Sequence, residues 1–429
     1  MNYRKRQTGY VLIQALVVIA GLVALMAMLY SNQHAALDVL QNRLDQRRAH
    51  QAAEAAMAEA LATLQQANTN QVALTDNWAQ LGSNGGVQSS SSNTTTADQE
   101  YTMGDGSSFR VQLVDAGSLI NINSATQQQL QQLPLTQEQV DSLLDFVSAG
   151  ETARPDGAKD AFYNALPQPY NAALGPLTTV NELLLVNNWT AQTLYQPITN
   201  VSGSLPMPTD SQGNTLPLAA LFTVDSGSPN TQPSGSALIN FNQRRLNVGQ
   251  LTRAGLSPAI ARRIASRAPY ANFAALLRQP GIDSQSMQIL LNMACFSTAT
   301  RQTGKVNLNT ASQAVLQTIP NVSTTMASDI VAQQGQGFTS LGQLATLPGI
   351  SQGQIPQIAD SFTTGSDTWI VRAWGEDSGV GEAVEAVVRV TNSQAQVINW
   401  DHISATTIPT WWDWPAQTSN TIQAGVIQQ

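Results

Sequence analysis

The chain has 429 residues, of which 42% are hydrophobic, so it is long enough for two or three domains with proper cores. Only 11% of the residues are charged, which predicts a largely neutral, polar surface suited to packing against other proteins. The formal charge of -8 excludes a general electrostatic attraction to nucleic acid. The single cysteine, Cys295, excludes an internal disulfide framework, and its apolar neighbours predict a buried thiol.

The N-terminal region has the pattern of one long helix that begins in a membrane. Basic residues at positions 4–6 precede an apolar run over residues 10–30, which is just long enough to cross a bilayer and is interrupted only by Gln14. Apolar residues continue at helical spacing as far as residue 67, which predicts one helix over residues 10–67. The positive-inside rule places the basic leader, residues 1–9, in the cytoplasm and everything after residue 30 across the membrane. A cleaved signal peptide would have a shorter apolar core and a small-residue cleavage site, so the pattern favours a retained membrane helix.

Two separated segments predict strands of one small antiparallel sheet. Residues 68–98 are rich in Gln, Ser, Thr and Asn and predict a linker. In residues 99–118, apolar runs flank Gly104-Asp105-Gly106, which is a hairpin signature. Residues 368–400 alternate apolar and polar side chains around a second glycine-rich turn. Residues 119–367 have helical character, so the predicted fold is α+β, a long helix packed on a sheet with a large all-α insertion.

The helical region is a repeat, because one short pattern opens three segments. These openings are Asn121-Ile-Asn-Ser-Ala, Asn240-Phe-Asn-Gln and Asn307-Leu-Asn-Thr-Ala, and the last two lie 67 residues apart. Phe296-Ser-Thr matches Phe362-Thr-Thr at nearly the same offset. The predicted units cover residues 119–236, 237–303 and 304–367, and the first includes an insertion over residues 150–176.

Each unit should contain helices joined by tight turns. Ser124 and Thr310 are the expected N-caps, because their hydroxyl groups can accept a hydrogen bond from the free amides of a first turn. The Pro-Gly pairs that begin at Pro280 and Pro348 should end one helix and start the next. The units are therefore predicted to be helix-hairpin-helix units.

The basic leader, Gly9, the large apolar Tyr10 and the long stem together resemble the type IV pilin and pseudopilin family. The resemblance implies cleavage between Gly9 and Tyr10 by a prepilin peptidase, and a single-pass protein of a bacterial inner membrane with most of the chain in the periplasm. Most members carry a glutamate where this chain has Gln14, and that glutamate is thought to pair with the N-terminal amine of a neighbouring subunit. The K subunits of type II secretion (GspK) lack this glutamate, so Gln14 points to a position at the tip. Chance exchange for an isosteric amide is the other interpretation.

The Asn-containing openings and the Leu-Pro-Gly-Ile hairpins resemble two families, the DNA-binding hairpins of competence proteins and the SAM-like helical insert of GspK proteins. The GspK resemblance covers nearly the whole chain. It implies a minor pseudopilin of type II secretion at the pseudopilus tip, which limits or initiates assembly. Its implied partners are other minor pseudopilins and the inner-membrane secretion platform. A minor pilin of a type IV pilus and a membrane-anchored, competence-like DNA-binding protein are the alternatives.

The distribution of charge bears on these alternatives. Residues 306–371 contain no Lys or Arg, so the third unit should repel phosphate. The second unit contains a candidate docking patch of arginines with no acid among them: Arg244, Arg245, Arg253, Arg262, Arg263, Arg267 and Arg278. Such a patch fits a nucleic acid or an acidic protein neighbour. Arginine pairs readily with carboxylates at interfaces, so protein docking is favoured over nucleic acid.

Candidate catalytic and metal-binding groups are few. His34, His50 and His402 are far apart in sequence, so we expect no histidine metal site, no general-base cluster and no enzyme activity. Some pseudopilins, GspK included, bind calcium through acidic side chains, but the two acidic clusters here lack EF-hand spacing and favour solvated faces. These clusters are Asp141, Asp145, Glu151, Asp156 and Asp160, and Glu376, Asp377 and Glu382. No other cofactor is expected. The tryptophan-rich tail, residues 401–429, predicts either a lid packed on the domain or a docking surface.

Overall fold

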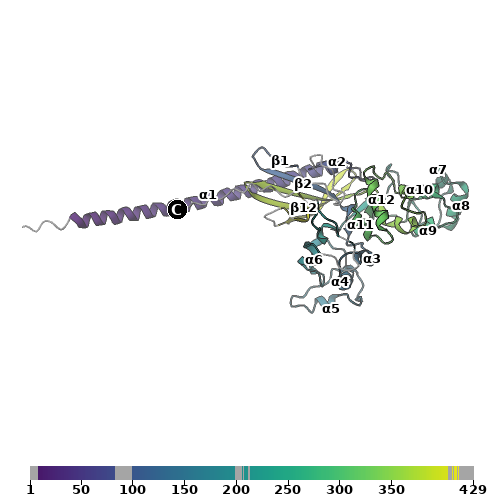
Figure 1. The fold of residues 1–429 in the computed structure, drawn as a ribbon, viewed down its shortest axis with the longest axis horizontal. Coiled ribbons are helices and arrows are strands. Elements are labelled where there is room, and N and C mark those ends of the chain that lie inside the picture. The colour runs from purple at the N-terminus through teal and green to yellow at the C-terminus, as the bar shows by residue number, and fades with distance from the viewer. Residues whose placement is uncertain are drawn as a thin grey trace, which may run out of the picture.

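The computed structural model describes residues 8–82, 99–198, 205, 207–210, 213–403, 408, 410–412 and 414. Helix α1 (Thr8–Leu64) runs without a break for 57 residues and projects far beyond the rest of the molecule (Figure 1). It begins inside the predicted leader and ends three residues before the predicted boundary. The basic leader residues 4–6 lie outside the described residues.

A five-stranded antiparallel sheet in the order β1-β2-β11-β12-β13 packs against the second half of α1. Its strands come from both predicted segments, β1 (Tyr101–Thr102) and β2 (Ser108–Asp115) from the first and β11 (Thr368–Asp377), β12 (Val380–Thr391) and β13 (Gln394–Ile403) from the second. Strands β2 and β11 are paired from Ser108↔Glu376 to Asp115↔Trp369. Two segments about 250 residues apart are therefore neighbours in one sheet, as predicted.

Small residues allow α1 to lie close to the sheet. Ala53, Ala56 and Ala60 are fully buried against β11 and β12. Gly375 on β11 is required at the closest approach, because a Cβ atom there would lie 2.0 Å from the carbonyl oxygen of Ala49. The apolar core of the pilin-like part is thus a close-packed interface between helix and sheet.

Part of the segment that was predicted to be a linker belongs to this core. Val72 and Trp78 are buried against α1 and the sheet, and helix α2 (Asn77–Gln80) holds Trp78 in place. Trp369 meets the Trp78 ring edge to face at 6.1 Å between centroids. The polar composition of the segment hid these two apolar anchors, and residues 83–98 lie outside the described part of the chain.

The insertion between β2 and β11 consists of three units, and each is closed by a two-residue parallel ladder. Unit 1 contains β3 (Ile120–Asn121), α3 (Gln127–Leu130), α4 (Gln137–Val147), α5 (Asp160–Tyr163), η2 (Val180–Leu185), α6 (Ala191–Tyr195), η3 (Leu218–Ala220) and β4 (Phe222–Thr223). Unit 2 contains β6 (Ile239–Asn240), α7 (Val248–Arg253), α8 (Pro258–Arg267), α9 (Phe273–Leu277), α10 (Ser284–Met293) and β7 (Ala294–Cys295). Unit 3 contains β9 (Val306–Asn307), α11 (Gln313–Thr318), α12 (Thr324–Gln334), η4 (Leu341–Thr346), α13 (Ile355–Ile358) and β10 (Phe362–Thr363).

The repeated asparagine has the same role in all three units. The side-chain oxygens of Asn121, Asn240 and Asn307 each accept a hydrogen bond from the backbone amide two residues later, at 3.0, 2.8 and 3.0 Å. This local turn lies between the short strand and the first helix of the unit. The sequence repeat therefore reports a repeated backbone conformation.

Two details of the repeat differ from the prediction. The N-caps are Thr126 and Ser312, two residues after the expected Ser124 and Thr310, because the asparagine turn occupies the intervening residues. Phe362 pairs with Val306 and Ala294 pairs with Ile239, and each partner is the first residue of the strand that opens its unit. Phe362 is therefore structurally equivalent to Ala294. The sequence match of Phe362 to Phe296 is out of register by two residues.

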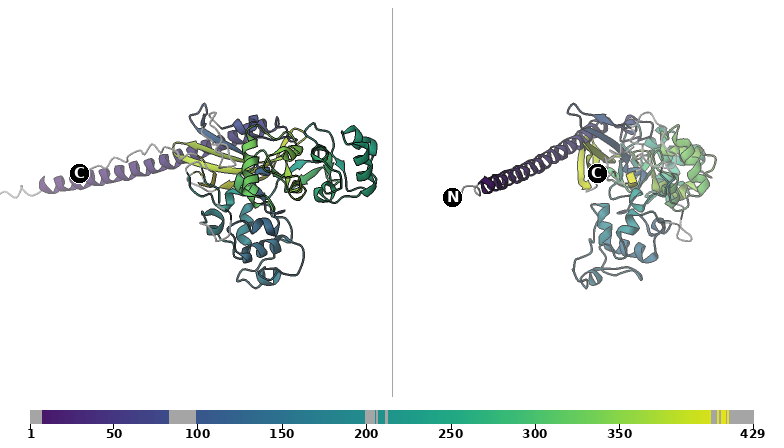
Figure 2. Two further views of the ribbon diagram at one scale, coloured as in Figure 1. Left: turned by 45° about the vertical axis from the view of Figure 1, so that its right-hand side comes forward. Right: turned by 60° about the vertical axis from the view of Figure 1, so that its left-hand side comes forward.

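The three units and the stem lie in different directions from the sheet. Unit 2 is at the end of the molecule opposite α1, unit 1 projects to one side, and unit 3 lies between the sheet and unit 2 (Figures 1 and 2). One continuous apolar cluster runs through all three units and is separate from the helix–sheet core.

Candidate assembly and docking surfaces

The first part of α1 is an exposed apolar rod. The helix is long and apolar enough to cross a membrane, with a mean hydropathy of 2.7 over its most apolar window and none of that window buried. Tyr10 is 66% exposed and Gln14 is exposed, and Gly9 has helical backbone. Apolar exposure continues past the predicted span at Leu37 and Leu40, so the surface that requires a partner is longer than a bilayer.

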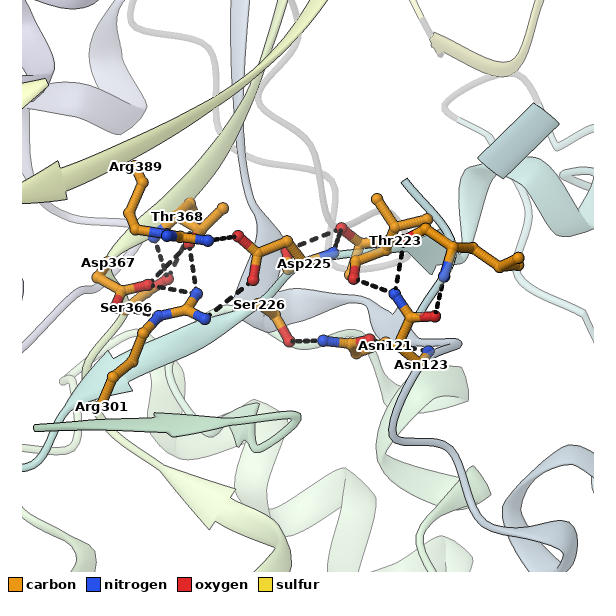
Figure 3. Close-up of polar contacts among 12 residues, drawn as sticks. Asn121, Asn123, Thr223, Asp225, Ser226, Arg301, Ser366, Asp367, Thr368 and Arg389 are labelled. Atoms are coloured by element: carbon orange, nitrogen blue, oxygen red, sulfur yellow. Dashed lines mark hydrogen bonds and ion pairs between the residues drawn. The ribbon is translucent and has the colours of Figure 1, made fainter. Parts of the chain in front are cut away.

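The insertion is joined to the sheet by a polar cluster, which we call the junction cluster (Figure 3). Arg301 at its centre binds Asp225 at 2.9 Å, binds Asp367 through two contacts at 2.6 and 2.9 Å, and donates to the Thr368 hydroxyl at 2.9 Å. Arg389 of β12 forms an ion pair with the other oxygen of Asp225. These residues link the segments between the units to the start of β11 and to β12, so the cluster orients the insertion on the pilin-like part.

The charge of Arg301 is stabilised by its surroundings. Desolvation lowers the pKa of the guanidinium, but the hydrogen bonds and charges of Asp367 and Asp225 outweigh it and raise the pKa above its ordinary value. Strand β5 (Gly227–Pro229) pairs with β8 (Arg301–Thr303) beside the cluster. Gly227 has no room for a side chain, because a Cβ atom would lie 2.4 Å from the Cζ atom of Arg301.

Asp115, at the end of β2, makes a second polar link. Its carboxylate accepts hydrogen bonds from the Gly117 amide at 2.8 Å, the Asn307 side chain at 2.8 Å and the Thr310 hydroxyl at 2.6 Å. Burial raises the pKa of Asp115, and the hydrogen bonds from Ser366, Thr310 and Asn307 oppose that rise. Thr310 therefore ties unit 3 to the sheet instead of capping a helix.

Two of the three histidines come together at the edge of the sheet, although the sequence predicted no histidine cluster. His50 of α1 and His402 of β13 contact the same oxygen of Glu382, at 2.9 and 3.0 Å. Trp400 donates to Nε2 of His402 at 2.9 Å, so the proton of a neutral His402 ring is on Nδ1, which faces Glu382. The hydrogen bond to Glu382 raises the pKa of His50.

Of the acidic residues that were candidates for solvated faces or calcium sites, Glu151 and Asp156 are exposed, whereas Asp145 and Asp377 contact cations of the protein itself. Asp145 is fully buried, and Arg154 forms an ion pair with it. The Lys159 ammonium donates to the carbonyl oxygens of Asp145 and Ser148, each at 2.6 Å, and to the Ser148 hydroxyl at 3.0 Å. In the second cluster, Asp377 pairs with Arg48 of α1 at 3.4 Å. No set of three or more acidic, histidine or cysteine side chains that could hold a metal lies in the described part of the chain.

The arginines of the candidate docking patch are all on unit 2. Arg253, Arg263 and Arg267 donate to neighbouring oxygens of Gly249, Pro280 and Gln279. The other four, Arg244, Arg245, Arg262 and Arg278, are exposed. None of the seven forms an ion pair with a described acidic residue.

The described part of the tail packs back on the molecule. Trp412 is fully buried and Trp414 is 8% exposed, and both lie with Trp374 on the face of the sheet away from α1. The Trp412 carbonyl accepts a hydrogen bond from Gln112 at 3.2 Å, and the Trp411 ring lies 5.1 Å from that of Tyr195 in unit 1. Of the two alternatives for the tail, these contacts support the lid. Cys295 is buried, as predicted.

Two family models match parts of the chain. The family model described as "Type II secretion system (T2SS), protein K" matches residues 112–199, and the model described as "Helix-hairpin-helix motif" matches residues 301–363. No curated protein matches. A chain of the crystal structure of the GspK–GspI–GspJ complex from the type 2 secretion system of enterotoxigenic Escherichia coli is similar at 14% identity and a TM-score of 0.47. That similarity covers 85% of this chain and 99% of the other.

A long apolar N-terminal helix packed on an antiparallel sheet defines a subunit of the type IV pilin-like class. The match to protein K falls on the end of β2 and on unit 1, where the helical insertion leaves the sheet. Residues 112–199 therefore carry the protein K domain of type II secretion systems, which supports a minor pseudopilin of the GspK type.

Proposed function

We propose that this minor pseudopilin occupies the tip of the pseudopilus and caps it. The observation that carries the proposal is the position of the insertion, which leaves the sheet between β2 and β11 and fills the end opposite the membrane helix (Figure 1). A subunit stacked above this one would have to occupy the space of units 2 and 3. Below the insertion, the exposed stem is free to pack beside the stems of other minor pseudopilins. GspI and GspJ, named in the complex above, are the partners whose class fits.

Gln14 supports the same position. A carboxylate within a bilayer is costly without a partner, and the subunit at a tip has no neighbour above it to supply one. A neutral amide at this place in α1 avoids that cost. Replacing Gln14 by Glu should therefore lower the membrane-assembled fraction of this subunit. An unchanged fraction would contradict the explanation.

Deletion of the insertion tests capping directly. Asp115 and Trp369 are paired across β2 and β11, so residues 116–368 can be replaced by an Asn-Gly turn that joins the two strands as a hairpin. The separate helix–sheet core should survive, which near-normal membrane levels would verify. We expect longer or unregulated pseudopili in cells that carry this variant. Fibres of ordinary length would refute capping.

Processing is a separate proposal, in which prepilin peptidase cleaves between Gly9 and Tyr10 before assembly. Replacement of Gly9 by a bulky residue should leave a slower-migrating, uncleaved band in a strain with active peptidase. The same replacement at Gly21, also on α1 and with nothing near its Cβ position, is the matched control and should leave processing intact. Equal mobility of the Gly9 variant and the wild type would overturn the assignment.

A further inference from the structure

Unit 2, which lies at the far end of the molecule from the membrane helix (Figure 1), is rich in arginine. Seven arginines and no acidic residue lie within residues 226–282, although the chain as a whole has a formal charge of -8. We call these seven residues the distal arginine surface. Its positive charge is opposite to the net charge of the rest of the protein. Unit 2 of a second copy would repel it, so it is suited to a partner with negative charge.

The arginines fall into two groups with different roles. Arg253, Arg263 and Arg267 are held by single contacts to a carbonyl or amide oxygen, which fixes their guanidinium groups while leaving other N–H groups available. Arg244, Arg245, Arg262 and Arg278 make no hydrogen bond or ion pair within the described part of the chain. Unit 2 thus exposes four arginines without a described internal partner together with three that are held by a single contact each.

The helix N-termini of unit 2 are partly occupied by their own capping side chains. DNA-binding hairpins present free backbone amides to phosphate. In each of the four helices, one amide of the first turn donates to the side chain of the helix's own N-cap: Asn247, Ser257, Asn272 and Asp283. A hydrogen bond from Ser286 lowers the pKa of Asp283, so this cap at the α9–α10 turn is an anion. Phosphate would meet that anion where a binding hairpin would offer amides.

We propose that the distal arginine surface docks an acidic protein surface. A carboxylate can be bound by guanidinium groups alone, without free backbone amides. The planar guanidinium of arginine forms two parallel hydrogen bonds with the two carboxylate oxygens. This set contains no lysine, which agrees with pairing to carboxylates. The proposal goes beyond capping, because the binding does not depend on where the subunit stands in the pseudopilus.

The test measures binding of a labelled decaglutamate peptide to the full chain in neutral phosphatidylcholine nanodiscs at physiological salt. Arg262→Gln with Arg278→Gln removes two arginines without contacts, so folding should be retained. Each exposed pair contributes about 0.2–1 kcal/mol, so this double variant should raise Kd by about 2- to 30-fold. Arg43→Gln with Arg47→Gln on the exposed stem removes the same charge and should change Kd by less than about twofold.

Three results would overturn the proposal. One is absence of decaglutamate binding by the wild type. The second is an equal loss in the unit 2 and stem double variants, which would indicate attraction to total charge only. The third is tighter binding of duplex DNA, or of phosphatidylglycerol vesicles, that is lost in the unit 2 variant, which would assign the surface to nucleic acid or to lipid.

Discussion

Replacement of Arg301 by Met should loosen the insertion from the sheet. The change removes three ion-pair contacts and one hydrogen bond to Thr368, and it leaves Asp367, whose side chain is 7% exposed, without its cation. Removal of one partner of a fully buried pair costs about 3–5 kcal/mol. Arg301 is 21% exposed and Asp225 keeps Arg389, so we expect the free energy of unfolding to fall by about 2–3 kcal/mol.

Urea denaturation followed by tryptophan fluorescence would measure this loss, and hydrogen exchange would show faster exchange of β5 and β8 amides. Gly227→Ala should have the same effect through displacement of the Arg301 guanidinium. Arg278→Met, at an exposed arginine of unit 2, is the matched control and should stay within about 0.5 kcal/mol of the wild type. If Arg301→Met also stays within that limit, the junction cluster does not hold the insertion in place.

Three further predictions concern the tail, the histidine pair and the buried lysine. Trp412→Ala should lower the free energy of unfolding by about 3–5 kcal/mol, because Trp412 is fully buried. The control Trp400→Ala, at a residue 36% exposed, should lower it by less than about 1 kcal/mol. Equal losses would contradict the interpretation of the tail as a lid packed on the sheet. Because the pKa of His50 is raised from 6.5, protonated His50 stabilises the folded state fully below that pH, and this stabilisation is lost as the pH rises through the folded-state pKa. His50→Gln should therefore reduce the change of melting temperature between acidic and alkaline pH. The control His34→Gln should leave that change as in the wild type. Since His50 is 42% exposed, the effect should not exceed about 0.5 kcal/mol. Lys159→Met should lower the free energy of unfolding by about 2–3 kcal/mol, because it removes the donor to two buried carbonyl oxygens. Calcium or a chelator should leave the wild-type melting temperature unchanged. A clear rise with calcium would refute the interpretation that the protein's own cations neutralise these acidic residues.

The features that the sequence predicts well are local or periodic. The stem follows from an apolar run with helical spacing, and the three units follow from an asparagine whose side-chain oxygen accepts a hydrogen bond from the amide two residues later. Their caps were misplaced by two residues because Ser and Thr are common at both positions, and only the turn geometry separates them. Local chemistry predicts that a turn exists more reliably than where the following helix begins.

The junction cluster and the histidine pair have no local pattern at all. Arg301 and Asp367 are 66 residues apart, Asp225 and Arg389 are 164 apart, and His50 and Glu382 are 332 apart. From the sequence alone, an arginine could lie in a buried ion pair or on an exposed surface. Most of the arginines in unit 2 are exposed. Only the return of the chain from the insertion to β11 brings these charges together.

The separation of the two apolar cores explains how a pilin-like subunit can carry so large an insertion. Apolar packing tolerates small shifts, whereas hydrogen bonds and bidentate ion pairs are directional, so polar contacts set an orientation more sharply. The insertion and the helix–sheet core are joined by the partners of Asp115 and Arg301, by backbone hydrogen bonds of Val72 and Ser366, and by a small apolar contact of Val114, Leu119 and Ile370. The stem and sheet thus pack on their own core, and the helical units pack on another. In the capping role that we propose, this division places the stem below, where it can pack with other subunits, and the arginine-rich unit 2 above.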